Sequence, residues 1–297
     1  MTRASDRLRE RMLDLAWSLW TGLGVPGQID NHGDCAIDPE PLILFTAGLG
    51  DADPRLRDEA TDWCIRYGQL VSGTRLKNLL VREGDEVRAG FGEFAATVAK
   101  HSSLRWLGST AAREHSPRER PKVKAFNRPS QVVLRLRALM GVGARADVIR
   151  VFLGRPDAAL GAADLATEIG YAKRNVALAL EMLRLGDVLD AFPIRNQIHF
   201  RISRANVERL RSLLGEMPRT FPRWSPFLRV VSRVHETAKR VEKLSPKVQA
   251  VEMMAVVRDL ADDIRDAEIP SPPSVAREEY LLVSLVSWCA ELSGYVD

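Results

Sequence analysis

The sequence lacks the features of membrane, secreted and disulfide-rich proteins. It has no run of about eighteen apolar residues, and charges interrupt residues 1–17, so we expect neither a transmembrane helix nor a secretory signal. Cysteine is scarce: Cys35, Cys64 and Cys289 lie far apart without CxxC spacing, which indicates reduced thiols. These absences predict a cytoplasmic protein with no membrane partner.

Motifs for nucleotide binding, metal binding and covalent catalysis are also missing. The sequence has no GxxxxGK[ST] loop, and GVGARAD at residues 141–147 lacks the third glycine of a dinucleotide-binding turn. His32, Asp34 and Cys35 lie together, but no second ligand cluster accompanies them. We therefore expect no catalytic residue, no cofactor and no metal site, and we predict that the chain is not an enzyme.

The charge that is present is unevenly distributed. The net charge of the 297 residues is +4, but residues 101–150 hold 11 Lys/Arg against 3 Asp/Glu, whereas residues 251–297 hold 3 against 10. A polyanionic partner would therefore meet the middle of the chain. A solvated charged face would give the same counts.

Apolar residues at helical spacing predict a mainly α fold. One amphipathic helix is expected over residues 5–22, two or three within 40–80, and another over 86–107. The polar, basic segment that follows contains three prolines and is interpreted as a linker. The predicted domains are a helical N-terminal domain (1–112), the linker (113–129), a central domain (130–205) and a helical C-terminal region (206–297).

The C-terminal region carries an apolar stripe at helical spacing, which is either a dimer seam or part of an intramolecular core. Its members are Val251, Met254, Val257, Leu260 and Ile264.

The central domain contains an ordered series of elements. Two short helices, ADVIRVFLG and AADLATEIG, precede a third that ends at Gly186, and the connection before the third contains Gly170. Alternating runs follow, with Ile198, Phe200 and Ile202 on one face and a turn over residues 193–196.

The stretch GYAKRNVALALEMLRLGDVL resembles the recognition helix of ArsR- and MarR-type bacterial repressors. The matching positions are Gly170, Lys173, Arg174, Asn175, Val176, Leu180, Leu183 and Gly186. The resemblance covers residues 144–202 and implies a central winged helix-turn-helix with a small β-hairpin wing, flanked by helical regions. Ala172 stands where the family usually has a Ser or Thr N-cap. No cysteine lies on this helix, so metal sensing is not implied.

The resemblance implies a transcriptional repressor that binds double-stranded DNA, as a homodimer because such repressors read two half-sites. Cations at a helix N-terminus are unfavourable unless an anion meets them. Arg174 would contact guanine, Asn175 adenine and Lys173 phosphate. The candidate DNA-binding residues are Tyr171, Lys173, Arg174, Asn175, Arg195, Asn196, Arg145, Lys122 and Lys124.

The alternative is a protein-interaction module that does not bind DNA. The phrase LRLRALMGVGARADVIRVFLG resembles segments beside or fused to bacterial nucleotidyltransferase-type toxins, which would make the chain an antitoxin-like partner. A basic surface made by Lys173, Arg174 and Arg195 would favour DNA, whereas exposed apolar side chains there would favour a protein partner. The N-terminal domain could hold a pocket for a small-molecule effector, or only a core.

Overall fold

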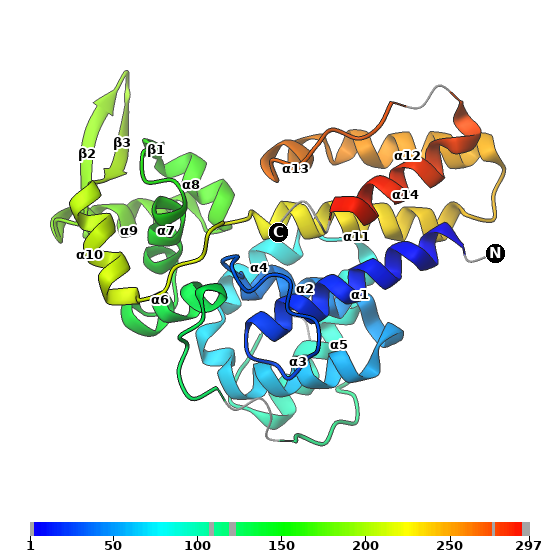
Figure 1. Ribbon diagram of the computed structural model, residues 1–297, viewed down its shortest axis with the longest axis horizontal. Helices are drawn as coiled ribbons and strands as arrows, with labels where there is room; N and C mark the ends of the chain where they lie inside the picture. Colours follow the sequence, from blue (N-terminus) through cyan, green and yellow to red (C-terminus); the bar gives the residue numbers. More distant parts are fainter. Residues whose placement is uncertain (1–2, 107–109, 119–122, 275–276, 293–297) are drawn as a thin grey trace.

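The computed structural model describes residues 3–106, 110–118, 123–274 and 277–292, and it is mainly helical with one small antiparallel sheet, as predicted (Figure 1). The elements are α1 (Ala4–Gly22), α2 (Pro39–Leu49), α3 (Pro54–Tyr67), α4 (Gly73–Leu80), α5 (Asp85–His101), α6 (Val132–Met140), α7 (Ala144–Gly154), β1 (Leu160–Gly161), α8 (Ala162–Ile169), α9 (Lys173–Leu185), β2 (Leu189–Ile194), β3 (Gln197–Ile202), α10 (Arg204–Leu214), α11 (Trp224–Val241), α12 (Pro246–Asp259), α13 (Ala261–Asp266) and α14 (Leu281–Leu292). None of the helices in these ranges combines the length and apolarity that crossing a membrane requires.

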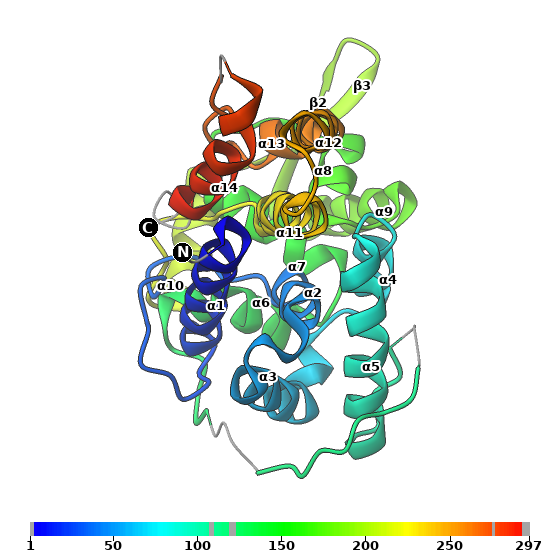
Figure 2. The same cartoon turned by 90° about the vertical axis from the view of Figure 1, so that its right-hand side faces the viewer.

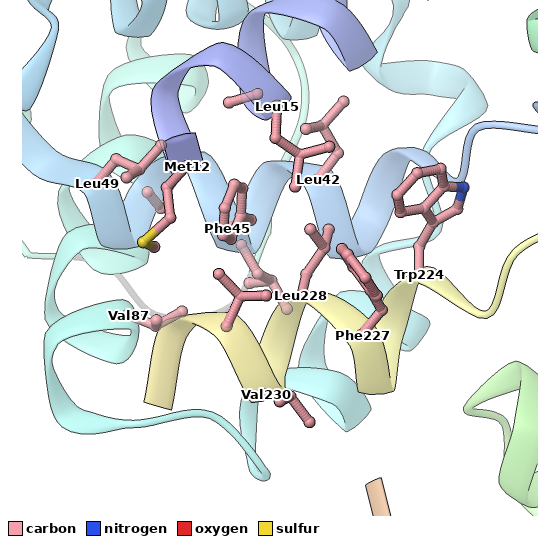
Figure 3. Packing of buried hydrophobic residues seen from close by; sticks show 14 of the residues in the cluster. Met12, Leu15, Leu42, Phe45, Leu49, Val87, Trp224, Phe227, Leu228 and Val230 are labelled. Carbon is pink, nitrogen blue, oxygen red and sulfur yellow. The ribbon is translucent and has the colours of Figure 1, made fainter. Parts of the chain in front are cut away.

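The first of two hydrophobic cores joins the beginning and the end of the chain. Helix α11 packs along α1 and α2, so that Phe227 and Leu228 meet Phe45 and Leu15 (Figure 3). The C-terminal helices α11–α14 therefore belong to the same core as α1–α5. This differs from the expected separate C-terminal region, because the apolar face of α11 is buried against N-terminal helices far away in the sequence.

The predicted C-terminal stripe is divided by this packing. Leu260 and Ile264 are buried in the first core, whereas Val251 and Met254 are 54% and 46% exposed. The intramolecular explanation therefore holds for the end of the stripe, and only its start remains available for contact with another molecule.

The second core is built from α6–α10 and the sheet. Its strands have the order β1-β3-β2, and the hairpin β2–β3 pairs from Leu189↔Ile202 to Ile194↔Gln197. Helix α10 joins this core through Val207 and Leu214, although it lies beyond the predicted domain boundary at residue 205. Strand β1 was not predicted, because its two residues are too few to show an alternating pattern.

A buried ionic network connects the two cores. Glu40 of α2 accepts hydrogen bonds from Arg137 of α6 (2.6 and 2.9 Å) and from Arg75 of α4 (2.7 Å). Arg75 also donates to Asp38, and Arg137 donates to Asp147 of α7 (3.1 and 3.2 Å). All five side chains are buried, so each charge depends on its partners for the stabilisation that water would otherwise give.

Burial and charge act in opposite directions on the two carboxylates of α2. Burial alone would raise the pKa of Asp38, but Arg75 and Arg150 overcome this effect and hold the pKa well below its usual range. For Glu40, burial outweighs the attraction of Arg137 and Arg75, and its pKa is raised. Loss of either arginine would therefore raise the pKa of Glu40 further.

Replacing Arg137 with methionine should lower the free energy of unfolding by about 3–5 kcal/mol, because Glu40 and Asp147 would lose a buried partner. Urea unfolding measures the change. Arg265→Met is the control: Arg265 is exposed and pairs with neighbouring carboxylates of α13, so its loss should change stability by less than about 0.5 kcal/mol. Equal effects of the two substitutions would show that the network does not stabilise the fold.

Glu236 of α11 is a half-buried carboxylate near the start of α5. One of its oxygens is buried and makes no hydrogen bond to any described residue. Burial, followed by repulsion from Glu86, raises its pKa to about 7. Because this pKa exceeds the value of about 4.3 expected for an unfolded chain, stability should fall as pH rises from about 4.3 to 7.

Glu236→Gln should therefore stabilise the protein at pH 8 by roughly 1 kcal/mol, after allowance for solvent screening, and leave it unchanged at about pH 4. Thermal unfolding of both proteins at the two pH values measures the difference. The exposed Glu10→Gln is the control and should have no effect at either pH. A gain for Glu236→Gln of the same size at both pH values would contradict the assignment of the raised pKa.

Candidate nucleic-acid interface

The connection between α8 and α9 is a short, defined turn. Helix α8 ends at Gly170, whose φ of +73° lies in the left-handed region that favours glycine, and whose N–H donates to the Ala166 carbonyl (3.1 Å). Tyr171 and Ala172 complete the turn before α9 begins at Lys173. The buried face of α9 consists of Val176, Ala179, Leu180 and Leu183.

Helix α4 holds this turn from the side of the first core. Arg75 Nε donates to the carbonyl of Ile169 (2.6 Å), and Asn78 Nδ2 donates to the carbonyl of Gly170 (3.1 Å). These carbonyls lie at the end of α8, where no further helical N–H is available to them. The contacts join residues more than ninety positions apart, and no local pattern in the sequence indicated them.

The first turn of α9 presents three exposed side chains. Lys173, Arg174 and Asn175 are all exposed, and neither cation forms an ion pair with a described residue. Ala172 lies at the N-cap in an extended conformation and provides no side-chain acceptor, as expected from the sequence. The helix N-terminus therefore carries uncapped N–H donors together with two free positive charges, an arrangement that attracts anions.

The tip of the hairpin β2–β3 projects away from both cores (Figures 1 and 2), whereas its base packs in the second core. Its turn consists of Arg195 and Asn196, both exposed, and Arg195 adopts a φ of +51°. The expected turn over residues 193–196 is thus two residues shorter, because Pro193 and Ile194 continue the strand. Arg201 lies over the ring of Phe192 on the same hairpin, with its Cζ 5.5 Å from the ring centroid.

Tyr171 does not lie on the exposed surface that was expected for it. Its side chain is 7% exposed and lines a cleft of about 670 Å³ near α4. Burial raises the pKa of its hydroxyl, with further contributions from Asp147 and Glu40. The tyrosine follows Gly170 directly, so the turn directs it inward, and the prediction that it contacts nucleic acid is corrected.

The other basic residues fall into three groups. Arg145 of α7 and Lys124 are exposed, as a surface role requires. Lys122 lies outside the described residues. Arg150, on the same helix as Arg145, is 5% exposed and lies close to the buried network. Arg150 is therefore excluded from a surface role by burial.

Farther along α9, the exposed face becomes apolar. Leu178, Met182 and Leu185 are 64%, 47% and 62% exposed. Ile194 and Ile198 of the hairpin are also exposed, at 40% and 54%, whereas Phe200, which was expected on the same face as Ile198, is buried. The same surface therefore combines a basic first turn with an apolar stripe.

Among the described residues, no group of His, Cys, Asp or Glu side chains is arranged to hold a metal ion.

Gly170→Ala tests how tightly the turn is defined. An alanine Cβ would lie 3.0 Å from Leu79 Cδ2, and the left-handed backbone adds strain, so stability should fall by about 1–2 kcal/mol. Gly186→Ala is the matched control: its φ is −82° and its nearest Cβ contact is 3.4 Å, so the change should stay within about 0.5 kcal/mol. Urea unfolding of both variants measures the difference, and equal losses would contradict a special requirement at Gly170.

Similarity to known proteins does not assign a function to this surface. Comparisons with protein-family models, with curated proteins and with solved structures find no match. The function must therefore be inferred from the geometry of α8, α9 and the hairpin.

Proposed function

We propose that the chain is a sequence-specific transcriptional regulator that binds double-stranded DNA through α9 and the β2–β3 hairpin. The observation that carries this proposal is the uncapped first turn of α9, where Lys173, Arg174 and Asn175 are exposed without ion-pair partners among the described residues. Cations at the N-terminus do not stabilise an isolated helix, but they stabilise the complex when that end of the helix meets a phosphate.

The order of the elements supports a winged helix-turn-helix. Helices α7, α8 and α9 are followed directly by the hairpin, and the short strand β1 between α7 and α8 pairs with β3. In proteins of this architecture, the third helix enters the major groove with its N-terminal residues toward the bases. The corresponding helix here is α9.

Each exposed residue has a chemical role in this proposal. Arg174 matches the two acceptors of guanine, Asn175 matches the donor and acceptor of adenine, and Lys173 neutralises a phosphate. Arg195 and Asn196 at the hairpin tip lie where a wing reaches the minor groove or the backbone. Arg145 and Lys124 add attraction that does not depend on sequence.

The proposal includes a homodimer, since two copies would read two half-sites. The exposed start of the C-terminal stripe, Val251 and Met254 on α12, is the candidate contact.

A second candidate function is supported by the apolar part of α9. Leu178, Met182 and Leu185 lie one turn apart on the exposed face, which is the pattern of a surface that packs against another protein. A regulator that also neutralises a partner enzyme would use this stripe. The DNA proposal is preferred because the free cations occupy the end of the helix that meets the groove.

Lys173→Ala/Arg174→Ala should weaken binding to duplex DNA from the region upstream of the chain's own gene by about 10- to 100-fold, since two charged contacts are lost. The slope of log K against log salt concentration should fall by roughly 1–2. Fluorescence anisotropy measures both quantities, with a random duplex to define non-specific binding.

Arg209→Ala/Arg211→Ala is the matched control, because it removes two exposed arginines from α10 and changes the net charge equally. It should reduce affinity for specific and random duplexes alike, and only slightly. Weak binding of every duplex by the wild type, unchanged in Lys173→Ala/Arg174→Ala, would overturn the DNA proposal and favour a protein partner.

A further inference from the structure

Two adjoining cavities lie between the second core and the start of α11. Their volumes are about 670 and 430 Å³, and both are lined by Arg150, Arg155, Glu168 and Arg223. Arg150 and Arg155 come from α7 and its C-cap, Glu168 from α8, and Arg223 directly precedes α11. The space is therefore bounded by both halves of the molecule.

Arg150 is buried at this junction, and no described residue forms a hydrogen bond with its side chain. Its side chain is 6% exposed, and its nearest carboxylates lie 3.9 Å (Asp38) and 3.8 Å (Asp147) away, beyond hydrogen-bonding distance. Its Nε is buried and makes no hydrogen bond to any described residue. A guanidinium has five N–H donors, and burying a donor without a hydrogen bond costs free energy.

The two arginines of the network differ from Arg150 because their terminal nitrogens bond to carboxylates, although the Nε of Arg137 also has no hydrogen-bonding partner among the described residues. Arg75 donates to two carboxylates and a backbone carbonyl, and Arg137 donates to Glu40, Asp147 and the carbonyl of Leu70. The carboxylates of the network thus lie at hydrogen-bonding distance from Arg75 and Arg137 but not from Arg150, which lines both cavities.

The charge around the smaller cavity also favours an anion. Four arginines, Arg150, Arg155, Arg219 and Arg223, line it against two carboxylates, Glu168 and Glu268. Glu168 is held between Arg155 and Arg223, so it does not compensate Arg150. Arg219 pairs with Asp34 and Arg223 with Glu268, so Arg150 is the lining arginine that has no carboxylate at hydrogen-bonding distance among the described residues. An added oxyanion would supply that acceptor.

The walls provide room and apolar contact for more than a bare ion. Trp224 and Leu160 line the larger cavity, and Phe221 lines the smaller one. The volumes lie within the range of about 300–1,000 Å³ that is usual for small-molecule sites. A small organic molecule that carries one acidic group fits the size and the lining of these cavities.

We infer that these cavities form a binding site for a small oxyanionic ligand, a phosphorylated or carboxylated metabolite whose acidic group is held by Arg150 with help from Arg155. The planar fork of a guanidinium matches two oxygens of either group. A bound ligand would contact α7, α8 and the start of α11 at once, and so would connect the two halves of the molecule beside the turn before α9. The site does not depend on the DNA proposal.

Isothermal titration calorimetry of the full chain with inorganic phosphate and, separately, with sodium acetate tests the inference, with sodium chloride at matched ionic strength as the reference. We expect saturable binding of at least one of the two oxyanions and none of chloride. Arg150→Gln should weaken that binding at least tenfold. Arg209→Gln, which alters an exposed arginine of α10 away from the cavities, should leave it unchanged.

Arg155→Gln is the second variant, since Arg155 is one-third exposed and its loss is compatible with folding even if Arg150→Gln is not. It should weaken oxyanion binding about three- to tenfold. Tighter binding of phosphate would point to a phosphorylated ligand, and tighter binding of acetate to a carboxylated one. The inference is overturned if neither oxyanion binds, if chloride gives the same heat, or if folded Arg150→Gln and Arg155→Gln bind as the wild type does.

Discussion

The buried network of Asp38, Glu40, Arg75, Arg137 and Asp147 is the constraint on which the arrangement of the molecule depends. Its members come from both hydrophobic cores, and none of them has access to enough water to be stable alone. A shift of α7 relative to α2 would separate charges that only one another can satisfy. The network therefore fixes the second core against the first more strictly than apolar contact would, because apolar surfaces tolerate sliding whereas bidentate ion pairs do not.

The same network extends to the surface proposed to bind DNA. Arg75 pairs with Asp38 and Glu40 through its terminal nitrogens and donates through Nε to the last residue of α8. The turn that orients the start of α9 is thus attached to the most constrained part of the interior. Arg150 borders both the network and the cavities, so a ligand bound to it would act close to this attachment.

The local elements were largely predictable from the sequence, whereas their tertiary partners were not. Apolar residues at helical spacing predicted α1, and the glycine at position 170 predicted the boundary between α8 and α9. Alternating apolar and polar residues predicted the hairpin. The pairing of Arg75 with Ile169, the burial of Arg150 and the inward orientation of Tyr171 all depend on contacts between distant segments. The spacing of apolar residues along the sequence does not indicate such contacts. The exposure of Lys173 and Arg174 was expected because it follows from the helix itself, and the exposure of Leu178 was not anticipated.

Hydrogen–deuterium exchange with and without an upstream duplex shows whether α9 and the hairpin contact DNA, because it locates the contact without altering the chain. We expect protection in peptides covering residues 170–178 and 192–199, and no change in peptides from α5. Protection confined to α12 or to α10, with the start of α9 unaffected, would contradict the assignment of α9 as the helix that enters the groove.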